Sequence, residues 1–343
     1  MNSFFKSNGK FLLTGEYLVL KGATALALPL KLGQSLEVES LYSDENLIYW
    51  DAFKTTDYGL RTTKPRSVEG IVRHFDKFID RSESTVNGQC QHWFSAVLSK
   101  TDFSIKSSDD QDKAKRLSDI LSKAKSLNEN LFTDSHDYRF STLLDFDPQW
   151  GLGSSSTLIN NVSEWADIDP YKLLDLTFNG SGYDIACAKA EGPIFYRLQN
   201  TEHKPQAETE AAPFNPPFKE NLFFIYQGHK QNSSNEVKAF LDQKRKYDDE
   251  IKSISEISKA LTGIKTLRDF CYFIRIHEDI ISDCLGRKRL KKYFNDFEGE
   301  IKSLGAWGGD FFLVATEWDE EKVKNYFNEK GLNTVFRYND IVL

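Results

Sequence analysis

The residues of this chain that could do chemistry lie in four short glycine-bearing segments, and the most specific is Trp150-Gly-Leu-Gly-Ser-Ser-Ser-Thr157. From Leu158 to Ala166, apolar residues recur with the period of a helix, so this glycine turn is expected to run directly into a helix N-terminus. Unpaired backbone N–H groups and the positive end of the helix dipole would converge there, and that arrangement binds phosphate. No Gly-Lys-Ser/Thr follows the glycines, so the segment is not the common P-loop; a plain capping turn is the alternative.

Each of the other three segments places a charged side chain beside glycine. In the first, Asn8-Gly-Lys10 opens an expected strand and Gly15-Glu16-Tyr17 closes it, so a cation and an anion stand at its two ends. In the second, Asp184 follows the turn Asn179-Gly-Ser-Gly-Tyr183. The third, Leu304-Gly-Ala-Trp-Gly-Gly-Asp310, precedes an expected strand. Taken singly, these segments could also be solvated charges, a helix N-cap and a structural turn.

The composition narrows the class of protein. A chain of 343 residues suggests two domains, and a net charge of −7 argues against a nucleic-acid groove as the main function. No window approaches the roughly 18 apolar residues of a membrane helix. The cysteines lack metal-site spacing and are expected to be reduced, mostly buried thiols of a soluble cytoplasmic protein: Cys90, Cys187, Cys271 and Cys284.

The elements that must position these segments can be predicted from hydrophobic period and turn signals. Strands are expected at residues 11–13, 17–20, 23–30, 36–42, 47–50, 194–198, 222–226, 311–316 and 334–338. Helices are expected at residues 68–79, 106–130, 169–178, 235–247 and 319–330, with two more in 251–284 and one ending near residue 304. The polar, proline-bearing stretch 201–217 is the predicted boundary between an N-terminal domain (1–200) and a C-terminal domain (218–343).

Taken together and in this order, the four segments resemble the GHMP superfamily of small-molecule kinases, named for galactokinase, homoserine kinase, mevalonate kinase and phosphomevalonate kinase. Gly-Leu-Gly-Ser-Ser at 151–155 is similar to the centre of the family's phosphate loop. Gly9-Lys10 with residues 15–20 resembles the first family motif, and Ser-Gly-Tyr-Asp at 181–184 the stretch with the catalytic aspartate. Residues 305–310 resemble the third, glycine-rich motif. The residues of these motifs are most similar to those of the mevalonate and phosphomevalonate kinases.

This resemblance implies an α+β fold, with an N-terminal half like domain 2 of ribosomal protein S5, a ferredoxin-like C-terminal half, and the site in the cleft between them. It implies ATP and Mg²⁺ as cofactors. The ATP phosphates would lie over Gly151, Leu152, Gly153, Ser154, Ser155 and Ser156, and Ser155 and Asp175 would be ligands of Mg²⁺.

The resemblance also assigns catalytic roles. Asp184 would accept or orient the proton of the acceptor hydroxyl, and Lys10 would stabilise charge on the transferring phosphoryl group. The residues expected to contact the acceptor are Glu16, Tyr17, Ser181, Gly182, Gly305, Ala306 and Gly308. The acceptor would be a small molecule, either mevalonate or 5-phosphomevalonate. The second acceptor would need cations for its own phosphate, and candidates are Lys21, Lys189, Arg197 and Lys230.

Two departures from the family pattern stand out: Asn8 replaces a proline, and Trp307 replaces a glycine of the third motif. If the backbone at Trp307 required a positive φ, a tryptophan would be costly there.

Two other functions share the expected fold. One is a non-catalytic ligand-binding relative; the other is a diphosphomevalonate decarboxylase, whose loop usually has Ala-Ser-Ser where this chain has Gly153-Ser-Ser155. The sequence predicts no nucleic-acid or membrane partner and leaves the oligomeric state open.

Overall fold

The computed structural model describes residues 2–43, 45–55, 85–86, 90–178, 180–200, 205–229, 233–305, 307 and 310–343. The helix expected at 68–79 lies outside the described residues. The chain falls into two compact units. The first unit comprises Met1–Asn8, Leu32–Pro148 and Ser154–Ile185, and the second unit comprises Gly9–Lys31, Gln149–Gly153 and Ala186–Leu343. The units interleave along the sequence, and the predicted boundary at 201–217 stays a prediction.

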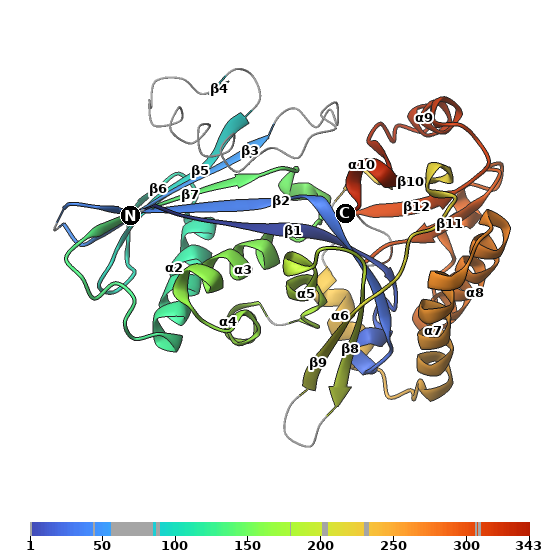
Figure 1. Cartoon of the computed structure of the whole chain (residues 1–343), viewed down its shortest axis with the longest axis horizontal. Coiled ribbons are helices and arrows are strands. Elements are labelled where there is room, and N and C mark those ends of the chain that lie inside the picture. The colour runs from blue at the N-terminus through green and yellow to red at the C-terminus, as the bar shows by residue number, and fades with distance from the viewer. Residues whose placement is uncertain are drawn as a thin grey trace. The chain divides into compact units, whose positions relative to one another are not determined.

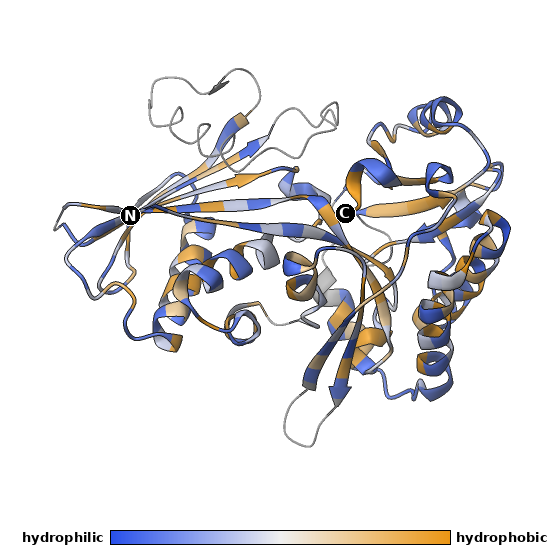
Figure 2. Cartoon of the chain, in the orientation of Figure 1, coloured by the Kyte–Doolittle hydropathy of each residue, from blue (hydrophilic) through white to orange (hydrophobic). Residues whose placement is uncertain are grey.

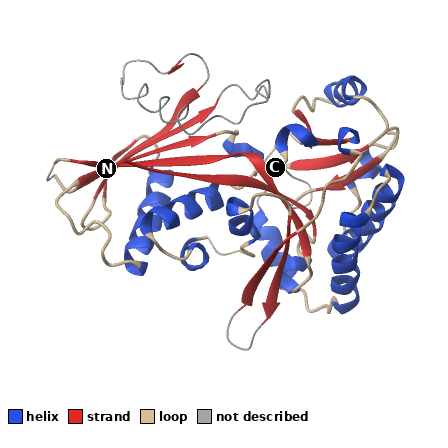
Figure 3. Ribbon diagram, viewed as in Figure 1, coloured by secondary structure: helices blue, strands red, loops and turns tan. Residues whose placement is uncertain are grey.

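The first unit is a mixed sheet covered on one face by helices (Figure 1, Figure 3). The strands are β1 (Asn2–Thr14), β2 (Ala25–Leu41), β3 (Leu47–Thr55), β4 (Thr85–Val86), β5 (Cys90–Ser99), β6 (Ile105–Ser108) and β7 (Asp137–Leu144). β3 pairs parallel with β7 and antiparallel with β5, and β2 pairs antiparallel with β7. The helices are α2 (Gln111–Leu127), α3 (Ser154–Ala166) and α4 (Pro170–Thr177).

The core of the first unit forms because the apolar stripe of α2 faces the sheet. Leu117 and Leu121 of this helix are buried in one cluster with Trp50 and Phe140, whose rings stack 4.9 Å apart. The helix expected at 106–130 begins later, at Gln111, after strand β6, and the Asp110 side chain caps it by accepting hydrogen bonds from the backbone N–H groups of the first turn.

A buried polar cluster fixes α3 to β1 and β2 within the first unit. Ser7 Oγ donates to Asn161 Oδ1 (2.6 Å) and accepts from Asn160 Nδ2 (2.8 Å). Thr157 Oγ1 donates to Gln34 Oε1 (2.7 Å), and Asn161 Nδ2 donates to the Gln34 carbonyl (3.0 Å). Each of these side chains makes at least one hydrogen bond within the cluster, and together the bonds orient the helix.

The second unit contains a four-stranded antiparallel sheet in the order β11 (Glu300–Ser303), β12 (Phe311–Ala315), β10 (Leu222–Tyr226), β13 (Val335–Arg337). Its helices are α6 (Ser233–Leu241), α7 (Asp248–Ala260), α8 (Leu267–Leu285), α9 (Glu320–Asn328) and α10 (Tyr338–Ile341). The start of β2 pairs with β8 (Ile194–Asn200), which pairs with β9 (Pro205–Ala211). The 3-10 turns are η1 (Leu18–Lys21), η2 (Pro148–Trp150, which spans the unit boundary), η3 (Lys219–Asn221), η4 (Leu261–Gly263) and η5 (Leu290–Tyr293).

Both faces of this second sheet are buried, and β10 and β12 are accordingly hydrophobic along their length (Figure 2). On one face, Phe223 and Ile225 pack with Phe327 of α9. On the other face, Phe224 stacks on Phe11 of β1, with ring centroids 4.5 Å apart. The strand that carries the first motif is therefore packed against the C-terminal sheet by aromatic contacts.

Two further local predictions are wrong, and each has a physical reason. Residues 17–20, expected as strand, are mostly the 3-10 turn η1, because Gly15 (φ 93°) and Tyr17 (φ 60°) turn the chain. The helix expected to end near residue 304 is strand β11, because ion pairs allow its polar residues to be buried.

Three further observations bear on the predictions. Part of the expected linker, Pro205–Ala211, is strand β9. Lys10 lies inside β1 rather than at its entrance. Across the described segments, no helix combines the length and apolarity that crossing a membrane would require.

Replacing Gly33 with alanine should destabilise the protein by about 1–3 kcal/mol. A Cβ at this position would lie 2.1 Å from the Ser7 carbonyl oxygen and 3.3 Å from Asn8 Cα, and both are backbone atoms of the paired strand β1. Urea unfolding measures the loss. Gly263→Ala is the matched control, since nothing lies within 4 Å of its added Cβ. Equal unfolding midpoints for both variants would contradict the close approach.

Candidate active site

The glycine turn enters a helix as the sequence predicts. Gly151 (φ 68°) and Gly153 (φ 98°) adopt left-handed backbone conformations, and α3 begins at Ser154. Of the three serines in the first turn of α3, Ser155 is exposed and Ser156 is buried. The first turn of an α-helix presents N–H groups that have no acceptor within the helix, and an anion site uses such groups.

The first motif lies directly beside this loop within the second unit. The backbone N–H of Lys10 donates to the Leu152 carbonyl, at 3.0 Å. The contact joins β1 to the middle residue of the Gly-Leu-Gly turn. The Lys10 side chain therefore leaves a backbone that is hydrogen-bonded to the candidate phosphate loop.

The third motif reaches the same loop through Asp310. A Cβ on Gly151 would lie 2.1 Å from Asp310 Oδ2, so only glycine leaves room for this carboxylate. Asp310 has a positive φ (48°), and its backbone is hydrogen-bonded to His229 and Gln227. A strained non-glycine backbone that its neighbours hold in place is a feature of functional sites. The first motif, the Gly-Leu-Gly turn and the third motif thus meet within the second unit.

Asp184 lies in the first turn of α5 (Tyr183–Lys189), after Gly180 (φ 141°) and Gly182 (φ 81°). The aspartate is half-buried, Gly182 is buried, and Ser181 is half-buried. Asp184 belongs to the first unit and Lys10 to the second. The convergence of these two side chains stays a prediction. Asn179 lies outside the described residues.

The two predicted magnesium ligands, Ser155 on α3 and Asp175 on α4, belong to the first unit, and both are exposed. A hydroxyl and one carboxylate fit Mg²⁺, which binds proteins through one or two carboxylates together with phosphate oxygens and water. Within the described ranges, no group of three or more His, Cys, Asp and Glu residues could hold a metal ion by itself. The phosphates of a nucleotide would have to supply the remaining ligands.

The turn after β1 is held in an unusual conformation. A Cβ on Gly15 would lie 2.7 Å from Ala25 Cβ, so this position requires glycine. Tyr17 is buried, and its hydroxyl donates to Glu236 Oε2 (2.8 Å) and accepts from the Trp307 N–H (3.2 Å). Burial, and then the hydrogen bond to Glu236, raise the pKa of Tyr17.

Trp307 of the third motif is buried rather than part of an exposed rim, and it is absent from the non-glycine residues with positive φ among those described. The tryptophan therefore carries none of the backbone strain that its place in a glycine motif suggested. Its carbonyl accepts a hydrogen bond from Arg287, which also pairs with Glu236.

Glu16 belongs to a buried charge cluster, which we define as Glu16, His277, Glu278 and Lys302. All four side chains are at most 1% exposed. Lys302 Nζ donates to Glu16 Oε1 and lies 3.1 Å from Glu278 Oε1. Burial raises the pKa of Glu16 to about 7, although the Lys302 charge opposes this shift. Burial also raises the pKa of Glu278.

His277 is neutral in this cluster. Burial and then the charge of Lys302 lower its pKa well below the ordinary value. Its Nε2 accepts a hydrogen bond from the Gly15 N–H (3.1 Å), so the ring proton is on Nδ1. Glu16 Oε2 lies 3.3 Å from the same Nε2.

The remaining predicted residues are distributed as follows. Gly305 has a positive φ (66°), and Ala306 and Gly308 lie outside the described residues, as does Lys230. Lys189 is exposed at the end of α5. Lys21 and Arg197 line one open cavity of about 410 Å³ in the second unit, together with Asp248.

Sequence reasoning missed the partners of the first motif: Glu236, His277, Glu278, Arg287 and Lys302. A buried charge on a helix or an edge strand has no local pattern that separates it from a solvated one. A weak signal was available in β11, where Glu300 and Lys302 alternate with Ile301, as period-two side chains of a strand do.

Comparison with known proteins identifies the fold. No family model matches the sequence, and no curated protein matches it significantly. Solved structures match along nearly the whole chain. A phosphomevalonate kinase of Streptococcus pneumoniae, in complex with phosphomevalonate and AMPPNP, has a TM-score of 0.64 at 16% identity, covering 98% of this chain and 99% of that one.

Two further structures show the same likeness. The mevalonate kinase of Methanococcus jannaschii has a TM-score of 0.62 at 15% identity, over 98% of this chain and 97% of that one. The galactokinase of Lactococcus lactis, complexed with galactose, has a TM-score of 0.59 at 10% identity, over 98% and 92%. The chain therefore has the α+β fold of the GHMP kinases, as its motifs predict.

The raised pKa of Glu16 predicts a pH dependence of stability. Between the unfolded pKa of 4.5 and the folded value of about 7, the folded state holds a proton that the unfolded state has lost. The free energy of unfolding therefore decreases as the pH rises through this window. Relative to Glu16→Gln, which cannot titrate, the wild type should lose on the order of 3 kcal/mol.

Urea unfolding of both proteins at pH 4.5 to 8 measures this difference. A wild type that gains stability over Glu16→Gln as the pH rises would contradict the buried, proton-holding carboxyl.

Proposed function

We propose that this protein is an ATP-dependent kinase that transfers the γ-phosphate to a small alcohol of the mevalonate pathway, either mevalonate or 5-phosphomevalonate. The observation that carries the proposal is the meeting of three motif segments within the second unit. The Lys10 N–H bonds to Leu152 of the glycine loop, and the Asp310 carboxylate packs on Gly151. The fold shared with mevalonate, phosphomevalonate and galactose kinases supports the same reaction class.

In this proposal the nucleotide phosphates lie over Gly151–Ser156 at the start of α3. Backbone N–H groups bind anions without a net positive charge, so an overall charge of −7 is compatible with a nucleotide site. Ser155 and Asp175 would hold Mg²⁺, which shields phosphate charge when bound. The buried bonds of Asn160 and Asn161 to Ser7 keep α3 in a fixed direction, so its N–H groups need little reorganisation to meet an anion.

The proposed chemical step divides between Asp184 and Lys10. Asp184 orients the acceptor hydroxyl and takes its proton, and Lys10 stabilises negative charge on the transferring phosphoryl group. Because the transition state of phosphoryl transfer is loose, catalysis depends mainly on positioning and electrostatic stabilisation. Glycines with positive φ before Asp184 fix the turn that presents its carboxylate.

The acceptor side would comprise Ser181 and Gly182 with the third motif. The cations Lys21 and Arg197, which line one cavity, are candidates for a second phosphate. The structure describes all four cysteines and joins none of them in a disulfide, in keeping with the proposed reducing, cytoplasmic location.

A panel of acceptors tests the proposal. With ATP and Mg²⁺, ADP release is expected with mevalonate or 5-phosphomevalonate and not with homoserine or galactose. Turnover of homoserine or galactose would move the protein to another kinase class, and CO₂ release would identify a decarboxylase. Turnover of no acceptor would favour a non-catalytic ligand-binding protein.

Asp184→Asn and Lys10→Ala should each lower kcat by at least about 100-fold, since each removes a group that acts only on the reacting atoms. ATP binding, measured by calorimetry, should survive both changes. Lys6→Ala is the matched control, because Lys6 lies on the same strand and, among the residues that the structure describes, forms a partly exposed ion pair with Asp145, at 3.7 Å. Full activity of either site variant would remove the assigned role.

A further inference from the structure

We propose that Lys302 is a positioning residue, which fixes the Gly15–Tyr17 turn and the third glycine motif as one body and thereby sets acceptor binding. This inference rests on the proposed function. It concerns a residue outside all four sequence motifs, on β11, two residues before the third motif begins at Leu304.

The first step of the argument is the link from Lys302 to the turn. Its Nζ donates to Glu16 Oε1, and the neighbouring Gly15 N–H donates to His277 of α8. Strand β11, helix α8 and the turn after β1 therefore meet at one ammonium group. All of these residues belong to the second unit.

The second step is that burial gives the link its strength. Lys302 is fully buried between Glu16 and Glu278, and it also donates to its neighbour's carbonyl, that of Ser303. In a water-excluded site these bonds are strong only while all partners are present. Removing one member leaves another buried charge without compensation. The energetic cost of an unpaired buried charge therefore holds these side chains in their present positions.

The third step is a second connection between the same two segments. Tyr17, the residue after Glu16, accepts a hydrogen bond from the Trp307 N–H of the third motif. Trp307 follows Lys302 by five residues. The first and third motifs are thus joined at two points, and a loss of the Lys302 bond would let both segments move relative to the glycine loop that Asp310 touches.

The fourth step concerns Glu16 itself. Its carboxylate is 1% exposed and is engaged by Lys302, so in this arrangement it does not face an acceptor. Its contribution to acceptor binding is then indirect, through the position of the turn. A residue that acts through another in this way should give non-additive effects in a double-mutant cycle.

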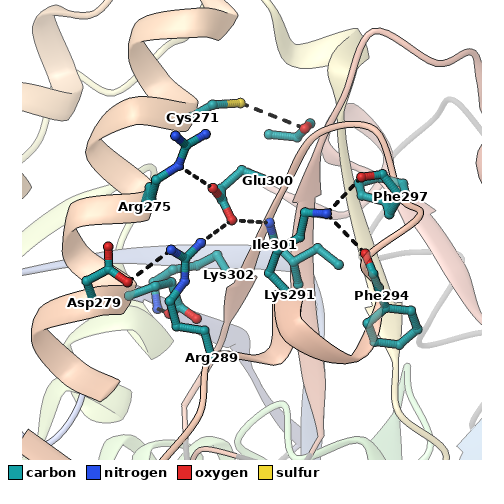
Figure 4. Close-up of polar contacts among 12 residues, drawn as sticks. Cys271, Arg275, Asp279, Arg289, Lys291, Phe294, Phe297, Glu300, Ile301 and Lys302 are labelled. Carbon is teal, nitrogen blue, oxygen red and sulfur yellow. Dashed lines mark hydrogen bonds and ion pairs between the residues drawn. The ribbon is translucent and has the colours of Figure 1, made fainter. Parts of the chain in front are cut away.

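Glu300 supplies a matched control on the same strand. It is also buried against α8, where Arg275 Nε donates to its Oε2 (3.0 Å) and Arg289 donates to its Oε1. Figure 4 shows this carboxylate between the two guanidinium groups, with Asp279 on the other side of Arg289. In the contacts that the structure describes for Glu300, none reaches Glu16 or Tyr17.

The experiment compares Lys302→Met and Glu300→Gln by hydrogen exchange and by kinetics. Exchange of peptides spanning residues 13–20 should be at least about tenfold faster in Lys302→Met, because the turn loses its bond from Lys302 to Glu16 and the Gly15 amide then separates more readily from His277. Glu300→Gln should leave this exchange unchanged. This readout needs no substrate, so it separates failure of this inference from failure of the proposed kinase activity.

Kinetics supply the second readout. Lys302→Met should raise the acceptor KM or lower kcat by about 10- to 100-fold while the ATP dissociation constant stays within twofold. Glu300→Gln should leave both unchanged. The double variant Lys302→Met/Glu16→Gln removes one of the two buried carboxylates that lose their cation and should be more stable than Lys302→Met, yet equally impaired. Additive effects of the two changes, or equal exchange in Lys302→Met and Glu300→Gln, would overturn the assignment.

Discussion

The close approach of Asp310 to Gly151 is the constraint on which the candidate site depends. Because Gly151 has no Cβ, the carboxylate that ends the third motif can pack directly on the glycine loop. The Lys10 N–H bonds to the next residue of that loop, Leu152. Segments separated by about half of the chain are thereby held at one turn, and a side chain at Gly151 would displace the Asp310 carboxylate from its present position.

Buried polar contacts, more than apolar packing, determine the arrangement around this turn. Phe11 stacks on Phe224 and holds β1 to the C-terminal sheet, but an aromatic contact tolerates small shifts. The charge cluster around Lys302 tolerates fewer, because each of its bonds requires a specific geometry. Burying these charges costs free energy, and the buried charges lie where the first and third motifs are held in register.

In the first unit, neutral polar groups rather than charges position the motif segment. Ser7, Asn160 and Asn161 anchor α3, whose N-terminus carries the serines of the glycine loop. Neutral hydrogen bonds orient the helix without placing a competing charge near an anion site. Each unit therefore contains its own rigid support for the residues that the proposed reaction requires.

The sequence by itself determined the features that depend on neighbours along the chain: the glycine turn entering α3 and the GHMP kinase fold that the motifs imply. It also identified Lys10 and Asp310, because they stand beside informative glycines. Only the tertiary structure decided that residues 17–20 turn instead of extending, that polar residues 300–303 form a buried strand, and that Lys302 pairs with Glu16. The reason is physical. Caps and turns are set by bonds a few residues apart, whereas the burial of a charge is set by partners nearly three hundred residues away, which local sequence cannot reveal.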